Sequence, residues 1–397
     1  MKKNKIFKIA LVLGIAIRLV LAITTYHSDL SALTISSHII LKGHVFSLYQ
    51  QGLNFVSDGL IYQPLAYFIP SLIYLPFAPL LSGISSILVR DPSVLLAGKS
   101  VYLPLLIYKL PLILADLSII WLLPQLFKSK EKKLNSQILW ALNPVAIYVS
   151  SMIGQVDAIL VFFLLAATIS AVSRRYIVSA LLLALSALTK PLSLALLPLL
   201  GIFAYYKKDF KQACLVVFAG LGLFAAIILP FLSSQAYKTY VLGAHHLNKS
   251  LFAGIEIAPG TQIPWFFIFY STIFLLAYRK KINLTQAFGA VVLSTLSFTH
   301  FHPQWFIWMT PWLIYYAVEK KRFFTYLVSI LAWLFVLFSF ESSLHINIFL
   351  NANKVLPQLP QLLTSNLSTL VLLARSWLIA VLIIDFIPLF YEKNSQK

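Results

Sequence analysis

The sequence predicts an all-α, polytopic integral membrane protein with about twelve transmembrane helices, forming a single domain over residues 1–397. The composition is the first reason: 60% of the residues are hydrophobic and only 11% are charged. The mean hydropathy of +0.86 is typical of membrane proteins. The second reason is that long apolar runs recur between short connections, none of which has room for a separate soluble domain.

The lysines and arginines predict the topology. A formal net charge of +19 would by itself suggest binding to nucleic acid. Most of the basic residues, however, lie in short clusters at every second connection between apolar runs. Cytoplasmic loops of membrane proteins carry such an excess of lysine and arginine. We therefore expect a multi-pass protein of the cell membrane, with both termini cytoplasmic and no nucleic-acid partner. The clusters are Lys2/Lys3/Lys5/Lys8, Lys128/Lys130/Lys132/Lys133, Arg174/Arg175, Lys207/Lys208/Lys211, Arg279/Lys280/Lys281, Lys320/Lys321/Arg322 and Lys393/Lys397.

The expected helices follow from these clusters. When each cluster is placed in the cytoplasm, the apolar runs between clusters pair off into outward and inward crossings. The longest stretches without an expected helix lie around residues 25–65, 232–263 and 341–366. The expected helices cover residues 6–24, 101–123, 136–153, 157–172, 177–189, 191–206, 211–231, 264–278, 284–299, 304–318, 323–340 and 367–390.

One further apolar run, Tyr62 to Val89, does not fit this alternation. Residues 25–61 would lie outside and the cluster at 128–133 inside, so the run cannot cross once. It also contains four prolines, which interrupt a spanning helix. We therefore expect a re-entrant or interfacial segment at the outer face, within a first external loop of residues 25–100 that contains interfacial helices. A true crossing under a weaker charge rule is the alternative.

Acidic residues and histidines are distributed unequally on this topology. All eight histidines lie outside, whereas each acidic residue of a cytoplasmic loop stands beside lysines. The outer face is therefore the expected place for chemistry. Asp29, in a polar patch with His27 just past the first apolar run, is the first candidate, because a carboxylate there can deprotonate an acceptor hydroxyl as a general base. A solvated residue at a helix end is the alternative.

Two further patches offer polar side chains at outer turns. Gln155 and Asp157 follow Gly154, so that a flexible backbone could direct both side chains into a cavity; a simple turn between helices is the alternative. Lys190, at the tip of an expected outer turn, could meet a phosphate as a point charge or could snorkel to the interface. His302 could donate to a phosphate or a hydroxyl.

Two further groups of residues are expected to have no catalytic or metal-binding role: the charges inside an apolar run, and the pair of histidines in one outer loop. Lys109 and Asp116 are seven residues apart, about two turns or roughly 10 Å along one face of a helix. Opposite charges within a membrane find partners in the bundle, so a structural ion pair is the favoured interpretation. His300 and His302 have no acidic partner nearby and make a poor metal site.

Together these patches resemble the GT-C superfamily of membrane glycosyltransferases, and within it the bacterial polyprenyl-phosphate-mannose-dependent mannosyltransferases. The matching segments are short and follow the family's order. The last third of the chain matches only as hydrophobic helices. The segments are Arg18 with Asp29, Tyr62-Gln63-Pro64-Leu65, Tyr108-Lys109-Leu110-Pro111 with Ala115-Asp116, Asn143-Pro144, Gly154-Gln155-Val156-Asp157, Thr189-Lys190-Pro191 and His302-Pro303-Gln304.

The resemblance implies that Asp29 is the catalytic base and that the Gly154–Asp157 turn lines the same cavity. Many superfamily members carry paired acids in the first external loop, whereas Leu30 and Ser31 follow Asp29 here, which favours a reaction without a metal. An inverting displacement also needs cations or donors on the departing phosphate. The expected substrate-binding residues are Asp157, Gln155, Lys190, His302, Gln304, Asp58, Arg90 and Tyr62.

The expected function is transfer of a hexose, with mannose as the first choice, at the extracytoplasmic face. A polyprenyl-phosphate sugar would be the donor substrate, with no cofactor, and a glycan, glycolipid or protein the acceptor. No glycine-rich phosphate loop follows a strand, as a nucleotide-binding domain would require. The alternatives are a lipid-linked glycan flippase or other transporter, whose charges should line a path near the midplane, and a surface-glycan polymerase or ligase.

Overall fold

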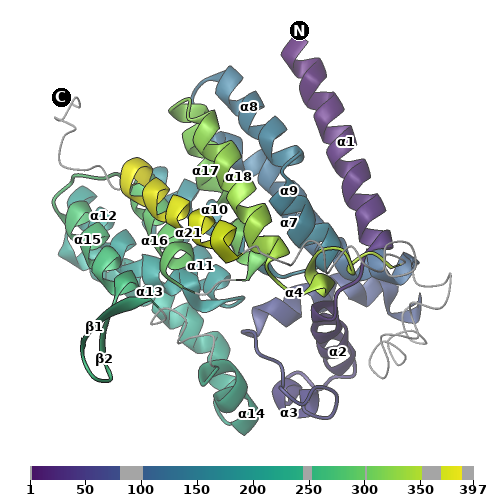
Figure 1. Ribbon diagram of the computed structural model, residues 1–397. Helices are drawn as coiled ribbons and strands as arrows, with labels where there is room; N and C mark the ends of the chain where they lie inside the picture. The colour runs from purple at the N-terminus through teal and green to yellow at the C-terminus, as the bar shows by residue number, and fades with distance from the viewer. Residues whose placement is uncertain (1, 81–101, 245–252, 300–301, 351–367, 387–397) are drawn as a thin grey trace.

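The computed structural model describes residues 2–80, 102–244, 253–299, 302–350 and 368–386, which form a helical bundle with one small hairpin (Figure 1). The hairpin pairs β1 (Gly254–Ala258) with β2 (Thr261–Pro264) in an antiparallel arrangement. The helices are α1 (Lys2–Thr24), α2 (Asp29–Leu41), α3 (Leu48–Gly52), α4 (Leu65–Tyr74), α7 (Tyr102–Leu122), α8 (Lys130–Ala141), α9 (Pro144–Ile147), α10 (Asp157–Val172), α11 (Tyr176–Ala187), α12 (Leu197–Lys207), α13 (Phe210–Ile228), α14 (Gln235–Tyr237), α15 (Trp265–Tyr278), α16 (Leu284–Phe298), α17 (Thr310–Glu319), α18 (Phe323–Phe338) and α21 (Ser368–Val381).

The helical character predicted from the sequence is confirmed, and each of the twelve expected ranges contains helix. The transmembrane count of twelve is not confirmed. Within the described part of the chain, four helices are long and apolar enough to cross a membrane, or five if one bent pair counts as a span. The other apolar helices have 10–17 residues. The four long helices cover Asn4–Thr24, Tyr102–Leu126, Phe210–Phe231 and Thr369–Phe386.

The bent pair has a local cause in the sequence. It joins α8 to the segment Pro144–Ile153 with a bend of 43°. Pro144 has no N–H to continue the hydrogen-bond ladder of α8 and is well suited to begin a helix. The side chain of Asn143 accepts from the backbone N–H of Ala146 at 2.9 Å and so caps the new helix. The expected single helix over 136–153 is therefore two helices with a capped start between them.

The predicted first external loop is richer in helix than expected. α2 and α3 lie within residues 25–65, which the sequence had suggested were largely non-helical. α4 continues through Pro70 and passes into a 3₁₀ turn at Leu75–Phe77. The re-entrant character of the segment Tyr62 to Val89 is not established, because residues 81–89 lie outside the described residues. The stretch 232–263 likewise contains α14 and the hairpin, so the fold is nearly rather than strictly all-α.

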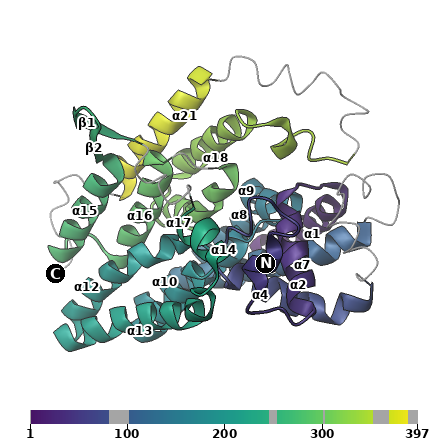
Figure 2. The same ribbon diagram turned by 90° about the horizontal axis from the view of Figure 1, so that it is seen from below.

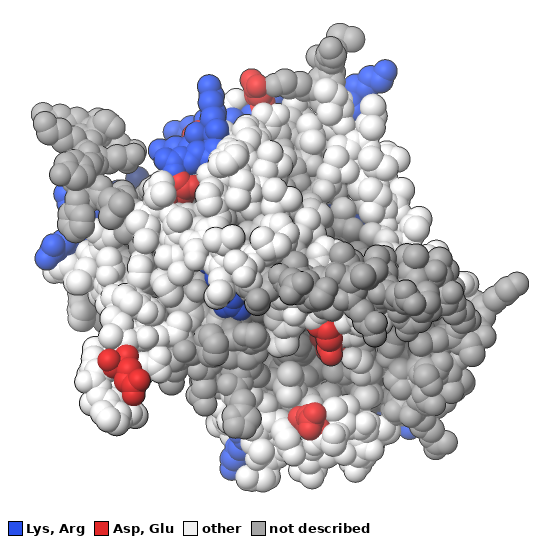
Figure 3. Space-filling view, viewed as in Figure 1, with Lys and Arg blue, Asp and Glu red and all other residues white. Residues whose placement is uncertain are grey.

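Basic side chains from separate loops gather at one end of the molecule. Figure 3 shows lysines and arginines concentrated where α8 begins and α17 ends, and Figure 1 places the N-terminus of α1 at the same end. Lys132 and Glu319 form an ion pair there at 2.9 Å. α2 and α3 lie at the opposite end (Figure 1). The arrangement agrees with the grouping of these clusters on one side of a membrane.

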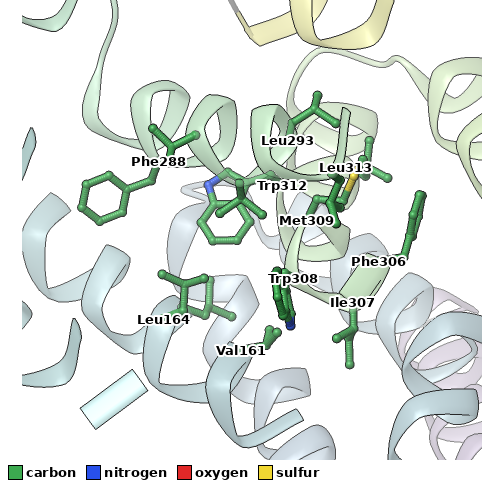
Figure 4. Packing of buried hydrophobic residues seen from close by; sticks show 14 of the residues in the cluster. Val161, Leu164, Phe288, Leu293, Phe306, Ile307, Trp308, Met309, Trp312 and Leu313 are labelled. Atoms are coloured by element: carbon green, nitrogen blue, oxygen red, sulfur yellow. The ribbon is translucent and has the colours of Figure 1, made fainter. Parts of the chain in front are cut away.

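Two hydrophobic clusters hold the bundle together. The larger extends from the last turn of α7 to α21, and Figure 4 shows its packing, with Trp308 and Trp312 against Val161 and Leu164 of α10. The smaller joins α2, α3 and α4 to α7. Seen from below, α10 lies among the helices of the larger cluster, and α2 and α4 lie near α7 to one side (Figure 2). Because α10 contacts α7 and α11, its N-terminus is fixed between the two clusters.

A buried ion pair ties α1 to α7: Asp116 forms the structural ion pair that was expected within the bundle, and its partner is Arg18. Arg18 Nε donates to Asp116 Oδ2 at 2.7 Å, and Arg18 Nη1 donates to the carbonyl of Ala141 at 2.6 Å. Trp140 Nε1 also donates to Asp116, at 2.8 Å. Arg18 on the neighbouring helix reaches Asp116 and supplies the cation. The ammonium of Lys109, two turns away, instead reaches the carbonyl oxygens at the end of α1.

Candidate active site

A cavity of about 460 Å³ lies where the two hydrophobic clusters meet. Its walls come from the start of α2, the turns before α4 and after α11, the end of α16 and the loop after α18. Five of the nine predicted site residues line it: Asp29, Tyr62, Lys190, His302 and Gln304. The complete lining is His27, Asp29, Ile61, Tyr62, Lys190, Pro191, Leu192, Ala195, Phe266, Thr295, Thr299, His302, Gln304, Trp305, Trp308, Glu341 and Leu344.

Asp29 is the first residue of α2, and its side chain is 36% exposed. Gln155 Nε2 donates a hydrogen bond to Asp29 Oδ2. Nδ1 of His27 accepts from the backbone N–H of Asp29 at 3.2 Å and lies 3.5 Å from the same carboxylate oxygen. One carboxylate oxygen is thus held by Gln155, while the group as a whole opens to the cavity.

Tyr62 and Gln155 extend this network. Tyr62 donates its hydroxyl proton to Gln155 Oε1 at 3.2 Å, which leaves the amide nitrogen of Gln155 to donate to Asp29. Burial raises the pKa of the Tyr62 hydroxyl well above its usual range, and the carboxylates of Asp29 and Asp157 raise it further. Tyr62 therefore stays protonated, and the chain of hydrogen bonds runs in one direction, from Tyr62 through Gln155 to Asp29.

Lys190 is buried and ion-paired, which corrects the expected position at the tip of an exposed turn. Only 7% of the residue is exposed. Its ammonium donates to Asp157 Oδ2 at 2.7 Å, and Trp308 Nε1 donates to the other carboxylate oxygen at 2.6 Å. The expected turn is present, because Lys190 is extended between α11 and the 3₁₀ segment Pro191–Leu196. Burial excludes the snorkelling alternative.

Aromatic rings surround the ammonium group of Lys190. Its nitrogen lies 4.8 Å from the centre of the Tyr62 ring and 5.9 Å from the rings of both Trp305 and Trp308. The two tryptophans stack with ring centres 4.8 Å apart and an interplanar angle of 15°. Ring faces carry partial negative charge, which suits both the cation and the C–H groups of a sugar ring.

Gly154 directs the chain into this site. A π-helical turn, Tyr148–Ile153, ends at Gly154, which has a φ of +79°. This left-handed conformation favours glycine. A Cβ atom added there would also lie 3.0 Å from Leu30 and 3.2 Å from Lys109. The glycine thus lets Gln155 approach Asp29 and lets α10 begin directly at Asp157, as the sequence pattern had suggested.

The remaining predicted residues differ in their outcomes. Gln155 and Asp157 are buried and do not line the cavity; they hydrogen-bond to Asp29 and Lys190, which do. Asp58, expected to bind substrate, is exposed in the turn before Gly59 and is not among the residues of the cavity lining. The structure therefore does not bring Asp58 to this cavity, and its role in substrate binding stays a prediction. Arg90 lies outside the described residues.

Several lining residues were not among the predicted site residues. His27 stands two positions before Asp29, a spacing that could have suggested its role. Glu341 comes from the far end of the chain, where the loop after α18 returns to the end of α1 through a bridge between Thr25 and Phe349. No local pattern marks that return. Within the described ranges, no group of three or more His, Cys, Asp or Glu side chains is arranged to hold a metal ion.

Comparison with known proteins supports the resemblance over the central part of the chain. Residues 74–206 match the family model described as alpha-(1->6)-mannopyranosyltransferase, N-terminal domain. The matched stretch includes Lys109, Gln155, Asp157 and Lys190 but not Asp29. No curated protein and no solved structure gave a match to the chain. Over residues 74–206 the chain is therefore similar to a GT-C mannosyltransferase family, and this similarity supports a membrane mannosyltransferase.

Proposed function

We propose that the protein transfers a hexose, with mannose as the expected sugar, from a polyprenyl phosphate to a hydroxyl group of a glycan, glycolipid or protein. The observation that carries this proposal is that a carboxylate and an ammonium group line one aromatic-walled cavity. Asp29 supplies a partly exposed carboxylate, and Lys190 supplies a buried ammonium group at the same cavity. These are the base and the cation that an inverting displacement on a sugar phosphate requires.

In the proposed reaction, Asp29 accepts the proton of the acceptor hydroxyl. The oxygen attacks the anomeric carbon as the bond from that carbon to the phosphate oxygen breaks, and polyprenyl phosphate leaves with the electron pair. Asp157 accepts one of the three N–H bonds of Lys190. A second N–H can then donate to the departing phosphate. His302 and Gln304 line the same cavity. In this proposal they hydrogen-bond the sugar or the phosphate.

The proposed orientation follows from the charges. The basic end of the bundle, where α8 begins, would face the cytoplasm together with both termini. α2, which begins at Asp29, extends toward the opposite end (Figure 1), and the reaction would then take place at the extracytoplasmic side. The bilayer and the lipid-linked donor are the proposed partners.

A transfer assay in right-side-out membrane vesicles tests donor and side together. Polyprenyl phosphate mannose and nucleotide-linked mannose are compared as donors, with a membrane-impermeant fluorescent oligomannoside outside as acceptor. We expect elongation of the oligomannoside only with the polyprenyl donor. Elongation from the nucleotide donor, or movement of the lipid-linked sugar between leaflets without any transfer, would contradict the proposal; the second outcome would identify a flippase.

A further inference from the structure

The buried ammonium group of Lys109 has no role in the proposed reaction. It nevertheless hydrogen-bonds to the two backbone segments that precede Asp29 and Gln155. The group is fully buried. It donates to the carbonyls of Ala22 at 3.1 Å, Thr25 at 2.7 Å and Met152 at 2.8 Å, and it lies 3.0 Å from Thr25 Oγ1. All four atoms are neutral oxygens, and none belongs to a carboxylate.

These oxygens belong to two segments that are far apart in sequence. Ala22 and Thr25 are at the end of α1, four residues or more before Asp29. Met152 is in the π-helical turn, three residues before Gln155. The hydroxyl of Thr25 also lies 3.0 Å from the carbonyl of Met152, which joins the same segments directly. Lys109 therefore fastens together the two backbones that carry Asp29 and its hydrogen-bond partner.

From this geometry we propose that Lys109 is a positioning residue, which sets Asp29 against Gln155 by holding the end of α1 to the turn before Gly154. The inference rests on the proposed role of Asp29 as the base. Carbonyl oxygens at a helix C-terminus carry partial negative charge, and hydrogen bonds from a cation to them are stronger than neutral ones. Without the ammonium group, buried carbonyls lose their donor, and the two segments are held together less firmly.

The replacement Lys109→Met tests this role, because it keeps the length of the side chain and removes the charge and the donors. A displacement of about 1 Å at a reacting group can lower the rate by about 10²-fold. We therefore expect kcat to fall by about 10- to 100-fold per folded molecule, with the KM for polyprenyl phosphate mannose changed by less than about twofold. A purely structural role would instead lower the yield of folded protein and leave kcat per folded molecule unchanged.

A milder variant guards against misfolding of Lys109→Met. Thr25→Val removes one oxygen ligand of Lys109, together with the direct hydrogen bond from Thr25 to Met152, and keeps the shape of the side chain. Thr168→Val is the matched control, because Thr168 is also buried and its hydroxyl also donates to the carbonyl four residues earlier. We expect Thr25→Val to lower kcat by about threefold to tenfold and Thr168→Val to leave it unchanged. Equal kcat values for the two valine variants would overturn the proposal.

Hydrogen–deuterium exchange of the full-length protein provides a readout that does not depend on activity. Lys109→Met should raise exchange in segments 25–31 and 152–157, and leave exchange in the core of α10 and α11 as it is in the wild type. Unchanged exchange in the two segments would overturn the proposal. If the wild type transferred no mannose from polyprenyl phosphate, the proposed function would fail while this exchange result still decided whether Lys109 holds the segments together.

Discussion

Replacement of Asp29 with asparagine should lower turnover by about 10²–10⁴-fold, the contribution that a positioned general base makes. Asparagine has the same size but cannot accept the proton of the acceptor hydroxyl at neutral pH. Gln155 can still hydrogen-bond to the oxygen of the new amide, so the geometry around position 29 is retained. Donor binding, measured by titration with polyprenyl phosphate mannose, should therefore stay within about threefold of the wild type.

Asp58→Asn is the matched control, because Asp58 is an exposed aspartate in the same part of the chain and is not among the cavity-lining residues. It should turn over at the wild-type rate. Added divalent metal should not restore Asp29→Asn. Near-normal turnover in Asp29→Asn would remove Asp29 from the role of base and make Glu341, the other carboxylate of the cavity lining, the next candidate.

The second large effect concerns the pair of Lys190 with Asp157. Replacement of Lys190 alone with methionine leaves a fully buried carboxylate without its counter-ion, a change that typically costs about 3–5 kcal/mol of folding free energy. The double variant Lys190→Met/Asp157→Asn removes both charges, and the asparagine side chain at position 157 can still accept from Trp308. We therefore expect the single variant to lose thermal stability strongly and the double variant to recover most of it.

The double variant separates folding from substrate binding. If Lys190 donates to the departing phosphate, the double variant should be stable and still bind polyprenyl phosphate mannose at least tenfold more weakly than the wild type, a loss of about 1.4 kcal/mol. Wild-type donor affinity in a stable double variant would show that Lys190 serves the fold and not the phosphate.

The positions of the helices could be predicted from the sequence because apolar runs and the connections between them are local features. The start of α10 at Asp157 and the break at Lys190 both follow from Gly154 and Pro191. The number of spans could not be predicted equally well, because several apolar runs form helices of 10–17 residues, shorter than a straight crossing needs.

Pairings between distant residues could not be predicted from local patterns. The acid that pairs with Lys190 is 33 positions earlier in the chain, and the cation that pairs with Asp116 is 98 positions earlier. Glu341 reaches the cavity only because the loop after α18 folds back to the end of α1. The sequence identified Asp29 and Lys190 as polar residues at helix ends. It carried no information on their burial, which depends on tertiary packing.

Photoaffinity labelling tests most directly whether the cavity binds the lipid-linked hexose. A polyprenyl phosphate mannose analogue with a diazirine on the sugar is bound to the purified full-length protein, irradiated, and the labelled peptides are identified by mass spectrometry. We expect labelling within residues 302–308 and 190–192, the two segments that contribute most to the cavity lining, and its loss when excess unmodified donor competes. Labelling confined to the exposed apolar faces of α1 and α13, with no competition by the donor, would contradict the assignment of this cavity as the active site.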